Sequence, residues 1–396
     1  MPPSKIAIIG AGPSGLVLAS LFYRHQIPFT IYDLRSRPSP FLINIPSGSL
    51  DLHVESGQLA LSECGLLETF RSLAVECSED YIICDRFGDM KIELRGHGGD
   101  RPEISRNSLI ELLLSSLPEN VIKWEHKVLS VTAHAANSQE QIITFGDGSF
   151  HTCDLVIGAD GAWSKARPLL TEINPTFSGI HWMTLTIVNV TERFPNMAQM
   201  VGTGTFSALG GKRAIMTQRS SMDSVRVYVT ICNEEVNYCN DAGLNSMDVE
   251  KIKEKLLGES GPFGDFSEGA QELLARGLKE EETAQFVQLC MLPTDHTWEH
   301  RAYATLVGDA AHLMTPFAGE GVNSAMLDAL ELAQGIISAV KNDTSISNAV
   351  KEYEMKMFVR AKENAEQTEM NMKNIFEDNA PKKIVEWFNS MMAPPE

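Results

Sequence analysis

The chain has little positive charge and no long apolar run. Its 33 Lys and Arg residues face 52 Asp and Glu residues, so the formal net charge is -19. Nucleic acids and anionic membranes attract proteins through concentrated positive charge, so neither is an expected partner. No apolar stretch approaches the roughly 18 residues that a membrane span requires, and no signal peptide precedes the first predicted strand. We therefore expect a cytoplasmic protein.

Cysteine is sparse, and two common kinds of site are missing. Seven cysteines are scattered without a C-x-x-C pair or a Cys/His cluster at metal-ligand spacing. Such an odd, dispersed set fits free thiols in a reducing compartment better than a disulfide framework. The Gly-x-Ser-x-Gly pattern of a nucleophile elbow is also absent. We predict neither a metal centre nor a nucleophile of this kind.

Length and composition leave room for a cofactor-binding core. The 396 residues suggest two domains, or one large domain with an inserted second lobe. A hydrophobic share of 43% and a charged share of 21% are those of an ordinary globular protein. Such a chain can enclose a cofactor, and we expect a monomer.

Two different strand patterns divide the chain. An apolar run at 5–10, a helical segment at 16–22 and a β-rich run at 29–32 predict a β-α-β unit that opens a parallel sheet. Residues 177–232 alternate between apolar and polar, which predicts antiparallel strands in a second lobe. Single helices are predicted over 58–73 and 346–376. The fold class is therefore α/β with α+β character.

The first chemistry-bearing motif is a glycine-rich turn between the first strand and the first helix. Its sequence is Gly10-Ala11-Gly12-Pro13-Ser14-Gly15. Glycines let backbone N–H groups approach a pyrophosphate at the positive end of the helix, and a proline suits the first turn of a helix. Asp33 ends the second strand, where its carboxylate could accept hydrogen bonds from an adenosine ribose. This motif alone does not separate FAD from NAD.

A second motif near residue 310 makes that separation. Residues 306–312 follow a predicted strand and contain Gly308-Asp309, and residues 316–323 open a helix. FAD needs a second anchor of this kind: an acid, Asp309, for the ribityl hydroxyls, and a helix N-terminus aimed at the flavin N1–C2=O edge. Pro316, Gly319, Glu320, Gly321 and Val322 form that helix start. We predict that His312 packs and hydrogen-bonds rather than serving as a base.

These motifs resemble the class A flavoprotein monooxygenases, which have the para-hydroxybenzoate hydroxylase fold. Residues 10–15, 154–161 and 308–312 match the three family signatures in order. Residues 50–58, 65–67, 104–107 and 308–327 are similar to the tetracycline-inactivating flavin monooxygenases. The resemblance covers most of the chain. It implies FAD contacts at Asp51, Arg106, Asp309 and Gly319–Val322, and it implies FAD and NADPH binding at Asp160 and Gly161.

The position of Arg106 in the sequence can also be interpreted without the resemblance. It begins a predicted helix, where a guanidinium could pair with a diphosphate through two parallel hydrogen bonds, or could be a solvated surface arginine. With the resemblance, the predicted fold is a Rossmann-like FAD-binding domain with an inserted antiparallel substrate domain and a long C-terminal helix. The expected segments are FAD-binding at 1–75, 106–176 and 291–343, substrate-binding at 76–105 and 177–290, and a bridging helix at 344–396.

The likeness to the tetracycline-active members fades between residues 177 and 290. Their substrate-contacting positions are occupied here by Thr184, Thr205, Arg226 and Ala270 in an ungapped alignment, so tetracycline is not an expected substrate. An arginine linked to NADPH in the family appears as Asn44, for which Arg35 or Arg37 could substitute. NADPH and NADH therefore both stay open. We predict substrate contacts at Phe317, Thr184 and Arg226.

The expected activity is an FAD-dependent monooxygenase. NAD(P)H would reduce the flavin, and O2 would form a C4a-hydroperoxide that oxygenates a small polycyclic, aromatic or natural-product-like substrate. Only one dinucleotide-binding fingerprint is visible, so NAD(P)H is expected to bind transiently, without a Rossmann domain of its own. The flavin itself is expected to perform the chemistry, and no catalytic side chain is predicted. Hydroxylation, epoxidation and Baeyer–Villiger insertion all stay open. The alternatives are a flavin oxidase, an NAD-dependent dehydrogenase and a non-catalytic redox-sensing flavoprotein.

Overall fold

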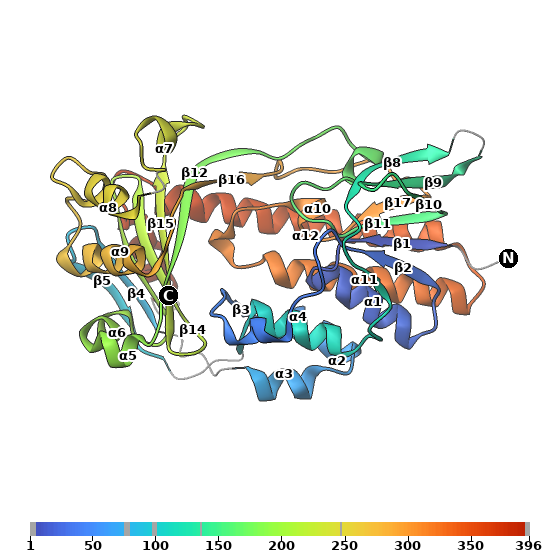
Figure 1. The fold of residues 1–396 in the computed structure, drawn as a ribbon, viewed down its shortest axis with the longest axis horizontal. Coiled ribbons are helices and arrows are strands. Elements are labelled where there is room, and N and C mark those ends of the chain that lie inside the picture. The colour runs from blue at the N-terminus through green and yellow to red at the C-terminus, as the bar shows by residue number, and fades with distance from the viewer. Residues whose placement is uncertain (1–4, 75–79, 97–100, 135–136, 246–247, 393–396) are drawn as a thin grey trace.

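The computed structural model describes residues 5–74, 80–96, 101–134, 137–245 and 248–392. Two large sheets lie at opposite ends of the long axis, and the long helix α12 (Ile346–Ile375) runs between them (Figure 1). The single helix predicted over 346–376 is confirmed. The mixed α/β class is confirmed as well. The six domain segments given above stay a prediction.

One sheet is parallel and lies inside the core. Its strand order is β17-β11-β1-β2-β7, and its strands pair in parallel throughout. All four residues of β1 and of β11 are buried, which explains why neither strand contains a polar side chain. The bounds are β1 (Ile6–Ile9), β2 (Phe29–Tyr32), β7 (Ile122–Lys123), β11 (Leu155–Gly158) and β17 (Ala304–Leu306).

Helices and a small sheet complete this core. Helices α1 and α11 pack side by side, and α11 also packs on α12. The three-stranded sheet β10-β9-β8 contributes Val131, Ile143 and Phe145 to the same cluster. The bounds are α1 (Pro13–Arg24), α4 (Arg106–Ser115), α10 (Asp309–His312), α11 (Gly321–Lys341), β8 (Val128–His134), β9 (Asn137–Phe145) and β10 (Phe150–Cys153).

The helix predicted over 58–73 is wrong as a single element. Two helices stand there, α2 (Gly57–Glu63) and α3 (Leu67–Leu73). Gly65 lies between them with φ 72°, a left-handed conformation that ends α2 and turns the chain. The preceding loop also contains a short 3-10 helix, η1 (Pro40–Asn44).

The second large sheet is mostly antiparallel, with the order β16-β12-β15-β14-β13-β4-β5. Strand β4 pairs with β13 in parallel. Odd-numbered residues of β12 and β15, such as Leu185 and Val227, are buried with Leu273 of α9. The bounds are β4 (Tyr81–Asp85), β5 (Met90–Leu94), β12 (Thr176–Ile187), β13 (Thr205–Gly210), β14 (Arg213–Ser220), β15 (Ser224–Cys232), β16 (Val287–Met291), α7 (Tyr238–Asp241), α8 (Val249–Leu257) and α9 (Glu268–Glu280).

The antiparallel strands predicted within 177–232 are present, but two short helices lie among them. The first strand ends at Ile187, and the short helices α5 (Val190–Arg193) and α6 (Pro195–Val201) follow before β13. Val190 is therefore helical and buried rather than the last residue of a strand. Its apolar side chain suits either state, so alternation alone could not place the boundary.

The two large sheets are joined by small elements as well as by α12. Strands β3 (Ser49–Asp51) and β6 (Glu103–Ser105) form a two-stranded sheet. At the far end of α12, Met372 and Phe376 pack with helix α13 (Lys382–Met392) against the seven-stranded sheet. Among the described residues, no helix has both the length and the apolar character to cross a bilayer.

Candidate functional site

The predicted motifs converge at one edge of the parallel sheet. Gly10 follows β1, Asp33 follows β2, Asp160 follows β11 and Asp309 follows β17. These four strands are neighbours and run in the same direction, so their carboxyl ends meet at one edge. Ligands of open α/β sheets bind in the crevice beyond that edge. Segments near residue 10 and residue 310 therefore lie at the same edge of the sheet.

The three glycines of the first motif have different physical roles. A Cβ on Gly15 would lie 1.9 Å from the Gly10 carbonyl oxygen, and a Cβ on Gly10 would lie 2.3 Å from that of Ala159. Both positions therefore need glycine for the close packing of strand and helix. A Cβ on Gly12 would meet no atom within 4 Å. Gly12 thus borders open space at the N-terminus of α1, where a phosphate can approach N–H groups.

The same open space recurs at the other predicted contacts. A Cβ on Gly161, Gly319 or Gly321 would also meet nothing within 4 Å. Nearby, Oδ1 of Asp160 is buried and has no hydrogen-bond partner among the described residues, and burial raises the pKa of that carboxyl. A ligand lying along this edge would fill the open space at these glycines. The residues present therefore fit an extended dinucleotide such as FAD.

Asp309 opens toward this space. Its side chain has exposed surface, yet the protein around it shields the carboxylate from bulk water and so raises its pKa. The positive charges of His312, Arg106 and Arg167 oppose this rise. It therefore faces a hollow inside the molecule rather than bulk solvent. The loop is fixed from behind by Asp328, which accepts hydrogen bonds from Gly308 N at 2.9 Å and from His312 Nε2 at 2.6 Å. His312 is thus a hydrogen-bonding residue of the core.

Arg106 stands at the first position of α4 with an exposed side chain. Its backbone N–H donates to the Gly48 carbonyl at 2.9 Å, which ties α4 to the segment before β3. Within the described part of the chain, its guanidinium has neither a hydrogen bond nor an ion pair. It interacts electrostatically with Asp309, so it is close to the same edge. This arrangement leaves its donors available for a diphosphate.

Replacing Arg106 by alanine should weaken FAD binding about 10- to 100-fold, since a hydrogen bond to a charged group contributes about 1.5–3 kcal/mol. Lysine should restore only part of the affinity, because it lacks the planar pair of donors. Titration of apo-protein with FAD, followed by flavin fluorescence, measures the change. Arg71→Ala on α3, which pairs with Glu68 on the surface, is the control. An unchanged dissociation constant for Arg106→Ala would place the diphosphate elsewhere.

Asp51 is joined directly to the helix that follows Glu320. Asn323 of α11 donates to the Asp51 carbonyl at 2.9 Å, and it accepts from His53 N at 2.9 Å. Asn323 is fully buried, so this clamp fixes the end of β3 against the start of α11. Neither the contact of Asn323 with this segment nor the burial of His53 was predicted, because no local pattern links residues 51–53 to residue 323.

Asp33 is buried and already saturated. Its carboxylate accepts hydrogen bonds from Ala11 N and from the backbone and side chain of Arg35. Burial raises its pKa, but these bonds outweigh that effect and hold the pKa below its usual range. In this structure Asp33 therefore braces the glycine-rich turn, and a ribose hydroxyl would have to displace Arg35.

The arginines considered as substitutes in an NADPH site are both engaged. Arg35 pairs with Asp33 at 2.8 Å, and Arg37 pairs with Glu119 at 3.1 Å. Asn44 lies at the end of η1 and is exposed. Neither guanidinium is thus free for a second nucleotide in this conformation.

The predicted substrate residues come from two parts of the molecule, the large sheet and the loop before α11. Thr184 and Arg226 lie on the even-numbered face of the large sheet, opposite the residues buried against α9. Arg226 donates to the Thr186 hydroxyl, while its Nε is buried without a partner among the described residues. Phe317, just before Gly319, packs against hydrophobic residues of the same sheet.

Two aromatic residues of this face were missed. The Trp182 ring lies 4.8 Å from the Tyr228 ring and 6.0 Å from the Phe317 ring, between centroids. Trp182 Nε1 donates to the Thr184 hydroxyl at 2.8 Å. Both residues share the two-residue period of Thr184 and Arg226, so the alternation of β12 and β15 could have revealed them.

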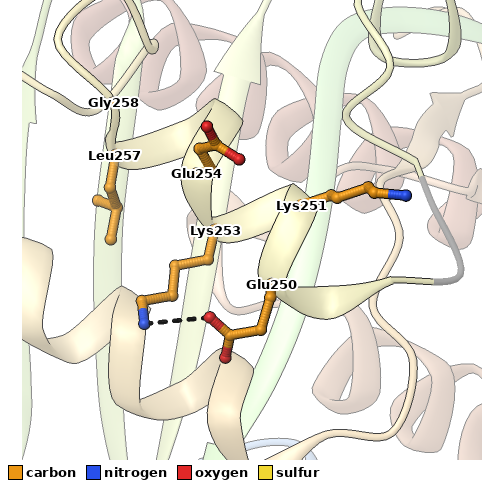
Figure 2. Close-up of a pocket in the computed structure, with 6 residues that line it drawn as sticks. All are labelled: Glu250, Lys251, Lys253, Glu254, Leu257 and Gly258. Atoms are coloured by element: carbon orange, nitrogen blue, oxygen red, sulfur yellow. Dashed lines mark hydrogen bonds and ion pairs between the residues drawn. The ribbon is translucent and has the colours of Figure 1, made fainter.

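The recess drawn in Figure 2 is a different feature. It runs along helix α8 on the outer side of the large sheet, away from the glycine-rich edge. Its lining is charged and solvent-facing, with Lys253 Nζ 3.4 Å from Glu250 Oε2. The exposed i,i+3 pair is typical of a solvated helix surface, and no cofactor-binding motif lies there.

Comparisons with known proteins agree with this geometry. A family model described as an FAD binding domain matches residues 4–261 and 300–368. Monooxygenase penA of Penicillium thymicola is 35% identical over 423 residues, covering 96% of this chain and 97% of that protein.

Two solved structures show the same fold at low identity. Klebsiella pneumoniae HpxO, complexed with FAD and uric acid, has a TM-score of 0.75 at 18% identity, covering 98% of this chain and 92% of that one. Tetracycline destructase Tet(55) has a TM-score of 0.73 at 17% identity, covering 99% and 96%. The predicted likeness to the class A fold, tetracycline-inactivating enzymes included, is confirmed. The chain belongs to the FAD-binding-domain family of FAD-dependent monooxygenases and is an oxidoreductase.

Proposed function

We propose that the enzyme takes electrons from NADPH or NADH and inserts one atom of O2 into a small, ring-bearing organic molecule. Bound FAD would supply the redox chemistry, accepting a hydride equivalent and activating O2. Gly12 and Arg106 would hold the diphosphate, and Asp309 the ribityl chain. The N-terminus of α11, at Gly319–Val322, would face the N1–C2=O edge of the flavin. These roles are supported by the open space at Gly12, Gly319 and Gly321.

The observation that carries the proposal is the approach of Phe317 to Trp182, with ring centroids 6.0 Å apart. Phe317 belongs to the loop that leads into α11, whereas Trp182 belongs to the large sheet. A substrate lying against this aromatic pair would lie beside the flavin ring and away from bulk water, as oxygen transfer requires. The aromatic side chains favour a planar ring, and the spare donor of Arg226 favours a carbonyl, phenolate or carboxylate group.

The activity is tested with purified, FAD-loaded protein under air. NADPH and NADH oxidation and O2 consumption are followed while phenols, polyketides and alkaloids are screened for stimulation. A substrate should gain one ¹⁸O atom from ¹⁸O2. Hydrogen peroxide together with an unlabelled oxidised product, formed without NAD(P)H, would indicate an oxidase, and product formed without O2 a dehydrogenase. No turnover above free FAD with any compound would favour a redox-sensing protein.

For the compound that stimulates best, Trp182→Ala should raise KM at least about tenfold, because truncating a buried aromatic contact costs about 2 kcal/mol or more. FAD affinity should not change, since the side chain contacts the Phe317 and Tyr228 rings rather than the glycine-rich edge. Phe150→Ala, which alters an exposed aromatic residue of β10, is the control. If Trp182→Ala kept the original KM, the substrate would bind elsewhere.

A further inference from the structure

A buried histidine lies between two carboxylates at the start of helix α11. His53 is only 5% exposed. Its Nε2 lies 3.1 Å from Asp51 Oδ2, and its Nδ1 lies 3.7 Å from Glu320 Oε1. Two other charged groups face it: Glu55, 3.9 Å from Nδ1 and largely exposed, and Arg101, which acts through space. The imidazole therefore bridges the end of β3 and the residue before α11.

This bridge differs in kind from the clamp made by Asn323. The amide of Asn323 binds the backbone of Asp51 and of His53, and also the Ser56 hydroxyl at 3.2 Å. All of those bonds join neutral groups, so they persist at any pH near neutrality. The contacts of His53 with Asp51 and Glu320 involve carboxylates. Their strength therefore depends on whether the imidazole carries a proton.

The local charges favour the protonated imidazole. The hydrogen bond to Asp51 raises the pKa of His53 by more than burial lowers it, and Glu320 adds to the rise while Arg101 opposes it. Burial raises the pKa of Glu320, which has Asp51 and Glu55 as like-charged neighbours. If His53 were neutral, Asp51 and Glu320 would repel each other across a shared, partly buried space. That repulsion would push the β3 segment away from the start of α11.

We propose that protonated His53 is a positioning residue, which holds Asp51 and Glu320 together at the N-terminus of α11 and so keeps the flavin end of the FAD site closed. FAD affinity should then be highest while His53 carries its proton and should fall as rising pH removes it. Reduced flavin, which carries negative charge at N1, should depend on this positive charge still more. The inference rests on the placement of FAD in the proposed function.

The test measures FAD binding rather than turnover. Apo-protein is titrated with FAD by flavin fluorescence between about pH 6 and 9, the range in which a histidine with a raised pKa titrates. Wild type should lose affinity on the order of tenfold across this range, the effect of one charged hydrogen bond. His53→Gln keeps hydrogen-bonding capacity without the charge, so its affinity should be low and independent of pH. His181→Gln alters an equally buried histidine of β12 and should match wild type.

Glu320→Gln provides an independent check, because it keeps His53 and removes one of the charges that favour its proton. The midpoint of the pH profile should move to lower pH. A profile that persists in His53→Gln, or a midpoint that stays in place in Glu320→Gln, would overturn the inference. If wild-type apo-protein bound no FAD at any pH, the placement of FAD would fail instead, so the two failures are distinguishable.

Discussion

Replacing Gly12 by valine is expected to give a folded protein that does not retain FAD. The backbone at Gly12 has φ -80° and ψ -175°, an extended conformation that valine adopts easily. No atom lies within 4 Å of the added Cβ, so the fold has no reason to change. The side chain would instead occupy the space through which a diphosphate reaches the N-terminus of α1. We expect FAD affinity to fall at least about 100-fold, equivalent to about 2.7 kcal/mol.

The measurements are flavin absorbance of the purified protein, reconstitution with FAD, and thermal unfolding of the apo form. Gly15→Val is the informative contrast, because its Cβ would meet the Gly10 carbonyl oxygen at 1.9 Å and should therefore prevent folding. Gly335→Ala within α11 makes an ordinary contact at 3.5 Å and should keep normal FAD content. A Gly12→Val protein with wild-type affinity would show that the diphosphate does not use this turn.

Replacing Asp328 by asparagine should lower the free energy of unfolding by about 3–5 kcal/mol, the usual effect of removing one partner from a buried charged group. Asp328 is fully buried and accepts from Gly308 N, from His312 Nε2 and, at 2.8 Å, from Arg360. Asparagine would remove the carboxylate that His312 and Arg360 share, leaving Arg360 with Glu331 alone. Denaturant unfolding of the apo-protein measures the loss.

The same network predicts how stability depends on pH. Burial lowers the pKa of His312, but the neighbouring Asp328 has the larger effect, so the pKa of His312 is raised. For Asp328, burial raises the pKa, but His312 and Arg360 have the larger effect, so the pKa of Asp328 lies below its usual range. The contribution of His312 is therefore complete below its ordinary pKa and is lost as pH rises through the raised value. That of Asp328 is lost as pH falls through the lowered value. Asp328→Asn should remove both dependences.

Glu331→Gln is the matched control for this network. Glu331 is the other carboxylate partner of Arg360, at 2.9 Å, but 27% of its side chain is exposed. Its removal should cost at most about 1 kcal/mol, as is usual for exposed pairs. Equal losses for the two variants would mean that burial of Asp328 contributes nothing extra.

Local sequence was sufficient to predict the two turns that follow β1 and β17. The run Ile6–Ile9, the glycines that follow and the helix from Pro13 specify a β-α-β turn through short-range sterics. The same holds for the strand β17 and the turn at Gly308-Asp309. Because parallel strands place their carboxyl ends at one edge, the convergence of these motifs follows almost directly.

Other features did not follow from hydrophobic periodicity or motif spacing. The helix over 58–73 breaks at Gly65, whose φ of 72° is set by the turn it makes and not by periodicity. The even-numbered face of β12 contacts the loop before α11 only because the folded chain brings Phe317 to Trp182. The Asp33 carboxylate was expected to accept hydrogen bonds from a ribose, yet in the folded chain it accepts them from Arg35 and from the Ala11 backbone.

The sequence by itself determined the glycine-rich turn after β1, the Gly308-Asp309 turn after β17 and the class of fold, since these follow from local backbone conformation and strand pattern. Tertiary structure alone decided which polar groups meet: His53 with Glu320, Asn323 with Asp51, and Asp328 with His312 and Arg360. Such pairs join segments distant in the chain, and no local rule of spacing or propensity encodes a contact between them.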